Sequence, residues 1–230
     1  MATVFVWENH FISRHAGDRT WTGHSSMSID DIFSDSRQLT DDGKVDDTSM
    51  ALAQGNDRFV SVWPGSSQLS GPKANSPGPH PFMTNCWKPC IDYMATCKPS
   101  IFADVALETY APDHVVRIGG LNVPKMKAKW RSIKQKQNAH YTFLRKNCST
   151  MVARVLGAAT PWYSTPTHLV WTPVDIRDWA LKLGTPMLWA DFIDELEQAG
   201  YSSAVQLNSL RQAKRRSKAR GTSGGAAKHP

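Results

Sequence analysis

The segment from Asn147 to Gly157 constrains the fold of this 230-residue chain more than any other. It opens with polar residues around Cys148 and continues with apolar side chains three or four positions apart, up to the glycine. This spacing predicts a helix with one buried face that stops at Gly157. The thiol of Cys148 then lies at a helix N-terminus, where unpaired N–H groups and the helix dipole favour a thiolate.

A histidine at the beginning of a predicted strand supplies the expected base. Residues 24–29 alternate between polar and apolar side chains, which is typical of a strand, and His24 is its first residue. An imidazole can take the thiol proton, and sequence order does not matter, because such sites are defined by geometry and roles. We expect Cys148 to be the nucleophile and His24 the base, with His140 and His114 as the alternative bases.

The remaining chain alternates predicted strands with predicted helices and favours an α+β fold. We expect one folded domain over residues 1–200, a loop-rich insert at 64–100, and a basic, disordered tail over 201–230. Strands are predicted at 3–8, 24–29, 58–63 and 114–118, and helices at 99–110, 124–137, 148–156, 172–183 and 188–199.

The positive charge of the chain is concentrated in two places. The net charge is +7, and the residues after Gly200 carry seven Lys and Arg with no acid, so the folded body is about neutral. This distribution argues against nucleic-acid binding except through the tail. Within the body, aspartates gather before Phe59 and ten basic residues lie from Arg117 to Arg154. That basic stretch would lower the thiol pKa and attract an anionic substrate, or it forms a solvated helix face.

Three further cysteines lie close together, but their spacing matches no standard zinc motif. Cys86, Cys90 and Cys97 follow His80 within a short stretch. We expect loop cysteines or one disulfide here, and neither a metal nor an organic cofactor.

Neither a membrane span nor a leader peptide is predicted. No apolar run approaches the ~18 residues that a span requires. The first ten residues lack the basic start and the long apolar stretch of a signal peptide. We expect synthesis in the cytoplasm and export by a route that needs no leader.

Three short motifs together resemble the NlpC-type cysteine peptidases, a papain-like family. Gly23-His24 resembles the family's histidine motif, and Asn147-Cys148-Ser149 resembles its nucleophile motif. Phe59-Val60-Ser61 aligns with the strand that carries the third, orienting residue. Because the cysteine comes last, the order is that of the circularly permuted branch, which includes lecithin:retinol acyltransferase-like enzymes. Tyr141-x6-Cys148 and the segment around Trp171 are also similar to permuted members among type VI secretion effectors.

The resemblance implies a fold, a site and a substrate. The fold is an antiparallel sheet packed against helices, and the catalytic residues are Cys148, His24 and Ser61. Serine departs from the family, which has His, Asn, Gln or an acid at this place, so Ser61 acts through water or another residue takes its role. The implied activity is cleavage of amide bonds in peptidoglycan stem peptides. The chain would be an antibacterial effector delivered to the periplasm of a target cell, with a secretion-machine component and an immunity protein as partners.

Two alternatives remain open from the residues. The same thiol could act as an acyltransferase, thioesterase or deamidase on a lipid or protein substrate. In the second alternative, the chain is a non-catalytic binding module whose basic tail docks on nucleic acid or an acidic partner.

Overall fold

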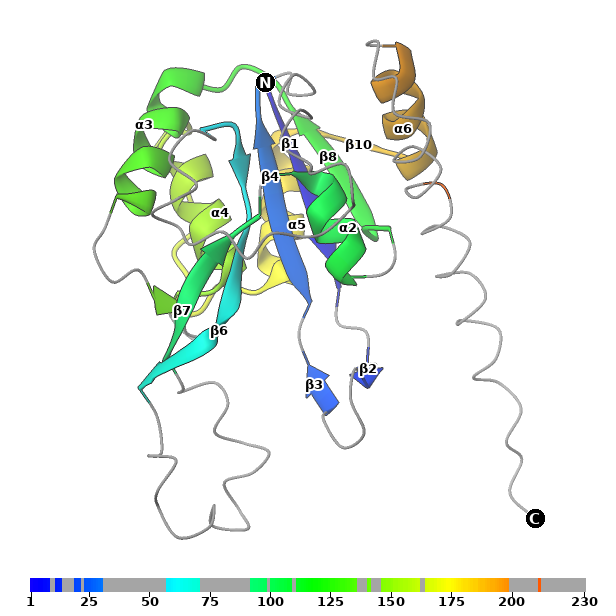
Figure 1. The fold of residues 1–230 in the computed structure, drawn as a ribbon. Helices are drawn as coiled ribbons and strands as arrows, with labels where there is room; N and C mark the ends of the chain where they lie inside the picture. Colours follow the sequence, from blue (N-terminus) through cyan, green and yellow to red (C-terminus); the bar gives the residue numbers. More distant parts are fainter. Residues whose placement is uncertain are drawn as a thin grey trace, which may run out of the picture.

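The fold was analysed in a computed structural model (Figure 1). It describes residues 1–8, 11–13, 19–21, 23–30, 57–70, 92–98, 100–108, 111–135, 140–141, 146–161, 164–198 and 211. The basic tail beyond residue 200, except Arg211, lies outside this part of the chain, as do Cys86 and Cys90.

A five-stranded antiparallel sheet forms the centre of the molecule. Strand β1 lies in its middle and pairs with β4 on one side and β8 on the other. The pairing of β1 with β4 places Trp7 opposite His24. In spatial order the strands are β10 (Thr185–Met187), β8 (His114–Ile118), β1 (Ala2–Trp7), β4 (His24–Ile29) and β5 (Phe59–Val60).

A second, three-stranded antiparallel sheet continues from the edge of the first. Strand β6 follows β5 directly, so Ser61 lies at the junction of the two sheets. The second sheet has the order β6 (Val62–Ser70), β7 (Asp92–Cys97) and β9 (His140–Tyr141). A small separate pair, β2 (Phe11–Ser13) and β3 (Arg19–Trp21), lies between β1 and β4 in sequence.

The strand predicted over 58–63 stops too early at its C-terminal end. We expected Pro64-Gly65 to end it, whereas β6 continues to Ser70. Its pairing with β7 is irregular on both sides of Gln68, and Pro64 takes part in it. A strand that pairs irregularly at the side of a small sheet tolerates a proline, which cannot donate a ladder hydrogen bond. The described parts of the predicted loop-rich insert, 64–70 and 92–98, are therefore largely strand.

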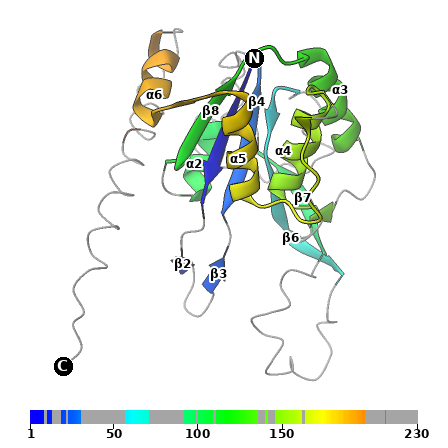
Figure 2. The same ribbon diagram turned by 180° about the vertical axis from the view of Figure 1, so that it is seen from behind.

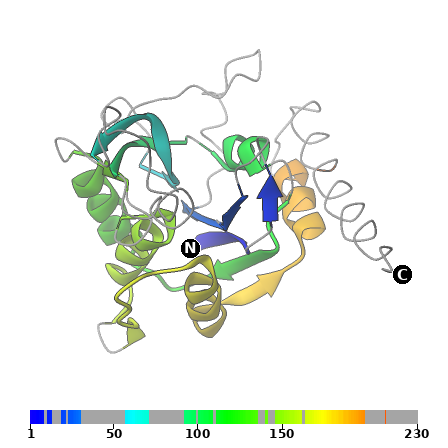
Figure 3. The same ribbon diagram turned by 90° about the horizontal axis from the view of Figure 1, so that it is seen from below.

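Helices cover both faces of the central sheet (Figures 2 and 3). The helices α3, α4 and α5 pack on one face, and α2 and α6 pack on the other. Their bounds are α2 (Ile101–Glu108), α3 (Val123–Lys134), α4 (Cys148–Gly157), α5 (Pro173–Leu183) and α6 (Trp189–Gln198).

Strand β1 has apolar side chains on both faces because both faces are covered. Val4 and Val6 pack in the cluster with α3, α4 and α5, whereas Phe5 and Trp7 pack in the cluster with α2 and α6. Alternate residues of a strand point to opposite faces, so each helical layer receives its own row of side chains.

The predicted α+β class is confirmed, and all five helices predicted from the sequence are present within one to three residues at each end. In the described part of the chain, no helix has the length and hydropathy needed to cross a membrane.

Gly23 allows β1 and the start of β4 to approach closely. A Cβ atom at this position would lie 2.3 Å from the carbonyl oxygen of Trp7, a backbone atom that cannot give way. By contrast, a Cβ at Gly119 would meet nothing within 4 Å. Position 23 therefore has no room for a side chain directly before His24.

We predict that Gly23→Ala lowers the free energy of unfolding by about 1–3 kcal/mol, the usual cost of overpacking. Gly119→Ala is the matched control and should change it by less than about 1 kcal/mol. Chemical denaturation of both variants measures the difference. Equal values for the two variants would contradict the close approach at Gly23.

Candidate active site

The N-terminus of α4 carries Cys148 as its first residue. Asn147 caps this helix: its Oδ1 accepts hydrogen bonds from the backbone N–H of Thr150 at 2.7 Å and from the Thr150 hydroxyl at 2.9 Å. Its amide nitrogen donates to the carbonyl oxygen of Trp171 at 2.8 Å. The cap ties the helix end to the segment before α5, and Cys148 is 4% exposed. The thiol is thus at a fixed position where the helix dipole favours a negative charge.

The start of β4 brings His24 to this thiol. His24 lies close enough to Cys148 for each side chain to shift the pKa of the other, and His24 is 3% exposed. The next residue of β4, Ser25, donates a side-chain hydrogen bond to Ser149 at 3.0 Å. This bond joins the strand to the helix directly beside Cys148 and His24.

Helix α2 adds a carboxylate that the sequence analysis did not identify. Asp104 is fully buried, and its Oδ2 lies 3.4 Å from Nε2 of His24. Cysteine, histidine and aspartate thus meet in one buried site, although they come from α4, β4 and α2. An acid beside the imidazole orients the ring and favours its charged form.

Ser61 contacts both the histidine and the aspartate. Its hydroxyl donates to Oδ1 of Asp104 at 2.6 Å and lies 3.4 Å from Nε2 of His24. The structure therefore brings the three residues predicted from sequence together. Ser61 itself supplies no charge, whereas Asp104 does, so the carboxylate has the charge needed to orient the imidazole.

Two tryptophans hold the imidazole in place. The ring of Trp63 stacks on that of His24 with centroids 4.2 Å apart, and Trp7 lies at 5.4 Å. The indole N–H of Trp63 donates to Oδ1 of Asp104 at 2.9 Å and also reaches the Ser61 hydroxyl at 3.1 Å. Trp63 therefore packs against the histidine and donates to the carboxylate.

The charges at this site favour a thiolate–imidazolium pair. Burial opposes charge on His24, but the Asp104 carboxylate and the Cys148 thiolate outweigh it and raise the pKa of His24 to about 10. Burial likewise opposes a thiolate at Cys148, yet the imidazolium and the hydrogen bonds from Ser25 and Ser149 bring the pKa of the thiol below its ordinary value. The pH range between these two pKa values is where both groups are charged.

Tyr141 on β9 points its hydroxyl at the nucleophile. The oxygen lies 4.0 Å from the Cys148 sulfur, and the side chain is buried. Burial and the neighbouring thiolate raise the pKa of Tyr141 well above its ordinary value. The tyrosine therefore remains a neutral hydrogen-bond donor beside the thiol.

The other predicted residues lie away from this site or outside the described part of the chain. His114 pairs with Glu8 at 3.2 Å, and the side chain of His140 is outside the described residues. Cys97 is buried in β7, where burial raises the pKa of its thiol to about 12. The described residues contain no group of three metal-ligating side chains.

Ion pairs neutralise part of the predicted basic stretch. Lys127 pairs with Asp30 at 3.0 Å, and Lys134 pairs with Asp57 at 3.2 Å, as does Arg131. These pairs join the aspartate-rich segment to α3. They do not include Arg154, the one cation of α4.

A signal for Asp104 was present in the sequence. It is the one charged residue in the otherwise apolar run 101–107. Aspartate is rarely fully buried without a partner, so an acid inside the apolar pattern of a helix indicates a buried polar contact. The pattern does not indicate which residue Asp104 contacts.

The comparisons with known proteins give one partial match. Residues 101–191 match the family model of the IcsB middle domain. This range includes Asp104 and Cys148 but not His24. The chain has no significant match among curated proteins or solved structures.

Proposed function

We propose that this protein is a cysteine hydrolase that cleaves amide bonds. The observation that carries the proposal is the buried contact of Cys148, His24 and Asp104, in which the charges favour a thiolate. A structural cysteine in an apolar core has a raised pKa, as Cys97 does here. Cys148 has the opposite shift although it is equally buried, and a lowered pKa is characteristic of a nucleophile.

In the proposed reaction, the sulfur of Cys148 attacks the carbonyl carbon of the scissile amide. The imidazolium of His24 then gives its proton to the leaving amine, and an acyl-enzyme remains. Water deprotonated by His24 attacks the acyl carbon and releases the thiolate. Because Nε2 of His24 faces Asp104, Nδ1 is the nitrogen available for these transfers. The backbone N–H of Cys148 and the hydroxyl of Tyr141 are the proposed donors to the oxyanion.

The proposed fold type is a circularly permuted, papain-like arrangement of the NlpC type. The histidine strand precedes the cysteine helix, and that helix packs on an antiparallel sheet. Peptidoglycan stem peptides are the substrate that this resemblance implies. The IcsB middle domain belongs to a Shigella effector, which supports a role as a secreted bacterial effector. A producing cell would then need a neutralising immunity protein.

A second candidate function is acyl transfer to a bound acceptor other than water. Cys148 and His24 are 4% and 3% exposed, so an acyl group on the sulfur would be shielded from solvent. Exclusion of water protects a reactive intermediate from hydrolysis. The two functions share the acyl-enzyme and differ in the second nucleophile.

We predict that the intact protein releases stem-peptide fragments from purified peptidoglycan and that Cys148→Ala releases none. Mass spectrometry of the soluble products identifies the bond. Cys97→Ala, which removes a buried thiol with a raised pKa, is the control and should retain activity. If neither the intact protein nor the control releases fragments, peptidoglycan is not the substrate, and protein and lipid acceptors should be tested for acyl transfer.

The pKa shifts predict a reactive thiol at neutral pH. Because the pKa of Cys148 is lowered, its alkylation by iodoacetamide at pH 7 should be faster than that of a cysteine with an ordinary pKa. Cys97 is the internal control, since its pKa of about 12 keeps it protonated at this pH. Peptide mapping after timed alkylation gives both rates. Equal slow rates would argue for a non-catalytic binding module.

Substitutions at the two partners of His24 should differ in effect. Asp104→Asn removes the charge that stabilises the imidazolium, so the rate of Cys148 alkylation at pH 7 should fall by roughly tenfold or more. Ser61→Ala removes one neutral hydrogen bond, worth about 1 kcal/mol, and should change the rate by less than about fivefold. Circular dichroism checks that both variants fold. A larger loss in Ser61→Ala would make the serine the orienting residue.

A further inference from the structure

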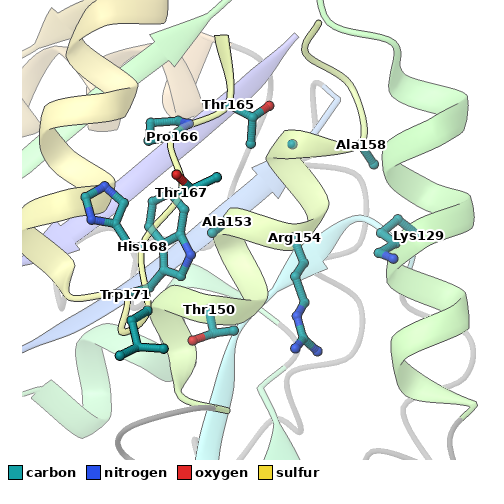
Figure 4. A pocket seen from close by; sticks show the side chains of 12 residues that line it. Lys129, Thr150, Ala153, Arg154, Ala158, Thr165, Pro166, Thr167, His168 and Trp171 are labelled. Atoms are coloured by element: carbon teal, nitrogen blue, oxygen red, sulfur yellow. The ribbon is translucent and has the colours of Figure 1, made fainter. Parts of the chain in front are cut away.

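A cavity of about 560 Å³ lies on the face of α4 that points away from the sheet (Figure 4). Thr150, Ala153, Arg154 and Gly157 follow one another at helical spacing and form its floor. Residues 165–171 bound the cavity on one side, and Lys129 of α3 bounds it on the other. Cys148 is not among the lining residues, so this cavity is separate from the candidate active site.

One end of the cavity carries two unpaired cations. Figure 4 shows Arg154 extending from α4 and Lys129 from α3, both on the same side of α4. Among the residues that the structure describes, neither has an ion-pair partner, and nor does Lys125 of α3, whereas three other cations of that helix each have one: Lys127, Arg131 and Lys134. Two exposed like charges beside a concave surface favour an anionic ligand.

The other end of the cavity is aromatic. Trp171 and His168 contact each other edge to face, with centroids 4.6 Å apart. Leu169, which also lines the cavity, is 91% exposed. A carboxylate, that of Asp175, lies 3.7 Å from His168. This end therefore suits an apolar or ring-bearing group, and it is unfavourable for a second anion.

We infer that this cavity is a second binding site, which takes an organic anion. The carboxylate or phosphate of the ligand lies against Arg154 and Lys129, and its apolar body lies towards Trp171. The inference rests on the cavity and its unpaired cations, so it is independent of the proposed hydrolase activity. A ligand here would contact Thr150 and Trp171, the two residues that hydrogen-bond to Asn147, the cap of the helix that presents Cys148.

The test uses the full chain and two simple anions, glutarate for a carboxylate and inorganic phosphate for a phosphate. At low ionic strength, NMR titration should give saturable shifts of the Thr150 amide and the Trp171 indole resonances with at least one of them. The anion that binds more tightly identifies the ligand group. The double variant Lys129→Gln, Arg154→Gln should bind about tenfold more weakly, as expected when two exposed charge contacts are lost.

Lys182→Gln on the exposed side of α5 is the control for the loss of a surface cation outside the cavity and should bind as the unaltered protein does. Both substituted positions in the double variant are exposed, and a thermal melt checks that it folds. The inference is overturned if neither anion shifts these resonances at millimolar concentration. Equal weakening by Lys182→Gln, or unchanged binding in the double variant, would also overturn it.

Discussion

The buried carboxylate of Asp104 is the interaction on which the site depends. Removing a carboxylate from water costs several kcal/mol unless donors and a counter-charge replace the solvent. Ser61 and Trp63 both donate to Oδ1, while Oδ2 has no hydrogen-bond donor among the described residues and faces the imidazole. A protonated His24 is therefore the group that neutralises this carboxylate. The same proton makes His24 a counter-charge for the Cys148 thiolate, so the burial of Asp104 stabilises the nucleophile indirectly.

The arrangement of the layers explains why the site lies at the start of β4. The sheet separates α4, which carries Cys148, from α2, which carries Asp104 (Figures 1 and 2). Side chains from opposite faces of a sheet can meet only past the end of a strand. His24 is the first residue of β4, directly after a glycine whose position leaves no room for a side chain. The short connection through Ser61, between the two sheets, reaches the same place.

The sequence was sufficient for the parts of this structure that depend on local patterns. The helix that begins at Cys148, the strand that begins at His24 and the helix that begins at Pro173 all follow from periodicity and end signals within a few residues. The pairing of Ser61 with His24 was obtained from a resemblance and not from periodicity. Asp104 was missed because its contact with His24 spans eighty positions of sequence and because α2 packs on the opposite face of the sheet from α4. The extension of β6 beyond Pro64 was missed because it depends on pairing with β7, which the sequence does not reveal.

The sequence likewise locates the charged segments of the chain but does not tell which charges form ion pairs. The sequence has an aspartate-rich segment and a basic segment, and either could have been a solvated surface. In the structure, Asp30 and Asp57 pair with cations of α3, so part of each segment serves to hold the chain together. The pair of Lys127 with Asp30 is partly exposed, and exposed pairs contribute little stability each, but they remove charge from the surface. Lys129 and Arg154 have no ion-pair partner in the described part of the chain, and the fold brings both to one cavity, which their positions along the chain do not indicate. The electrostatic surface that a ligand meets is thus determined by which ion pairs the fold forms, and not by the number of basic residues.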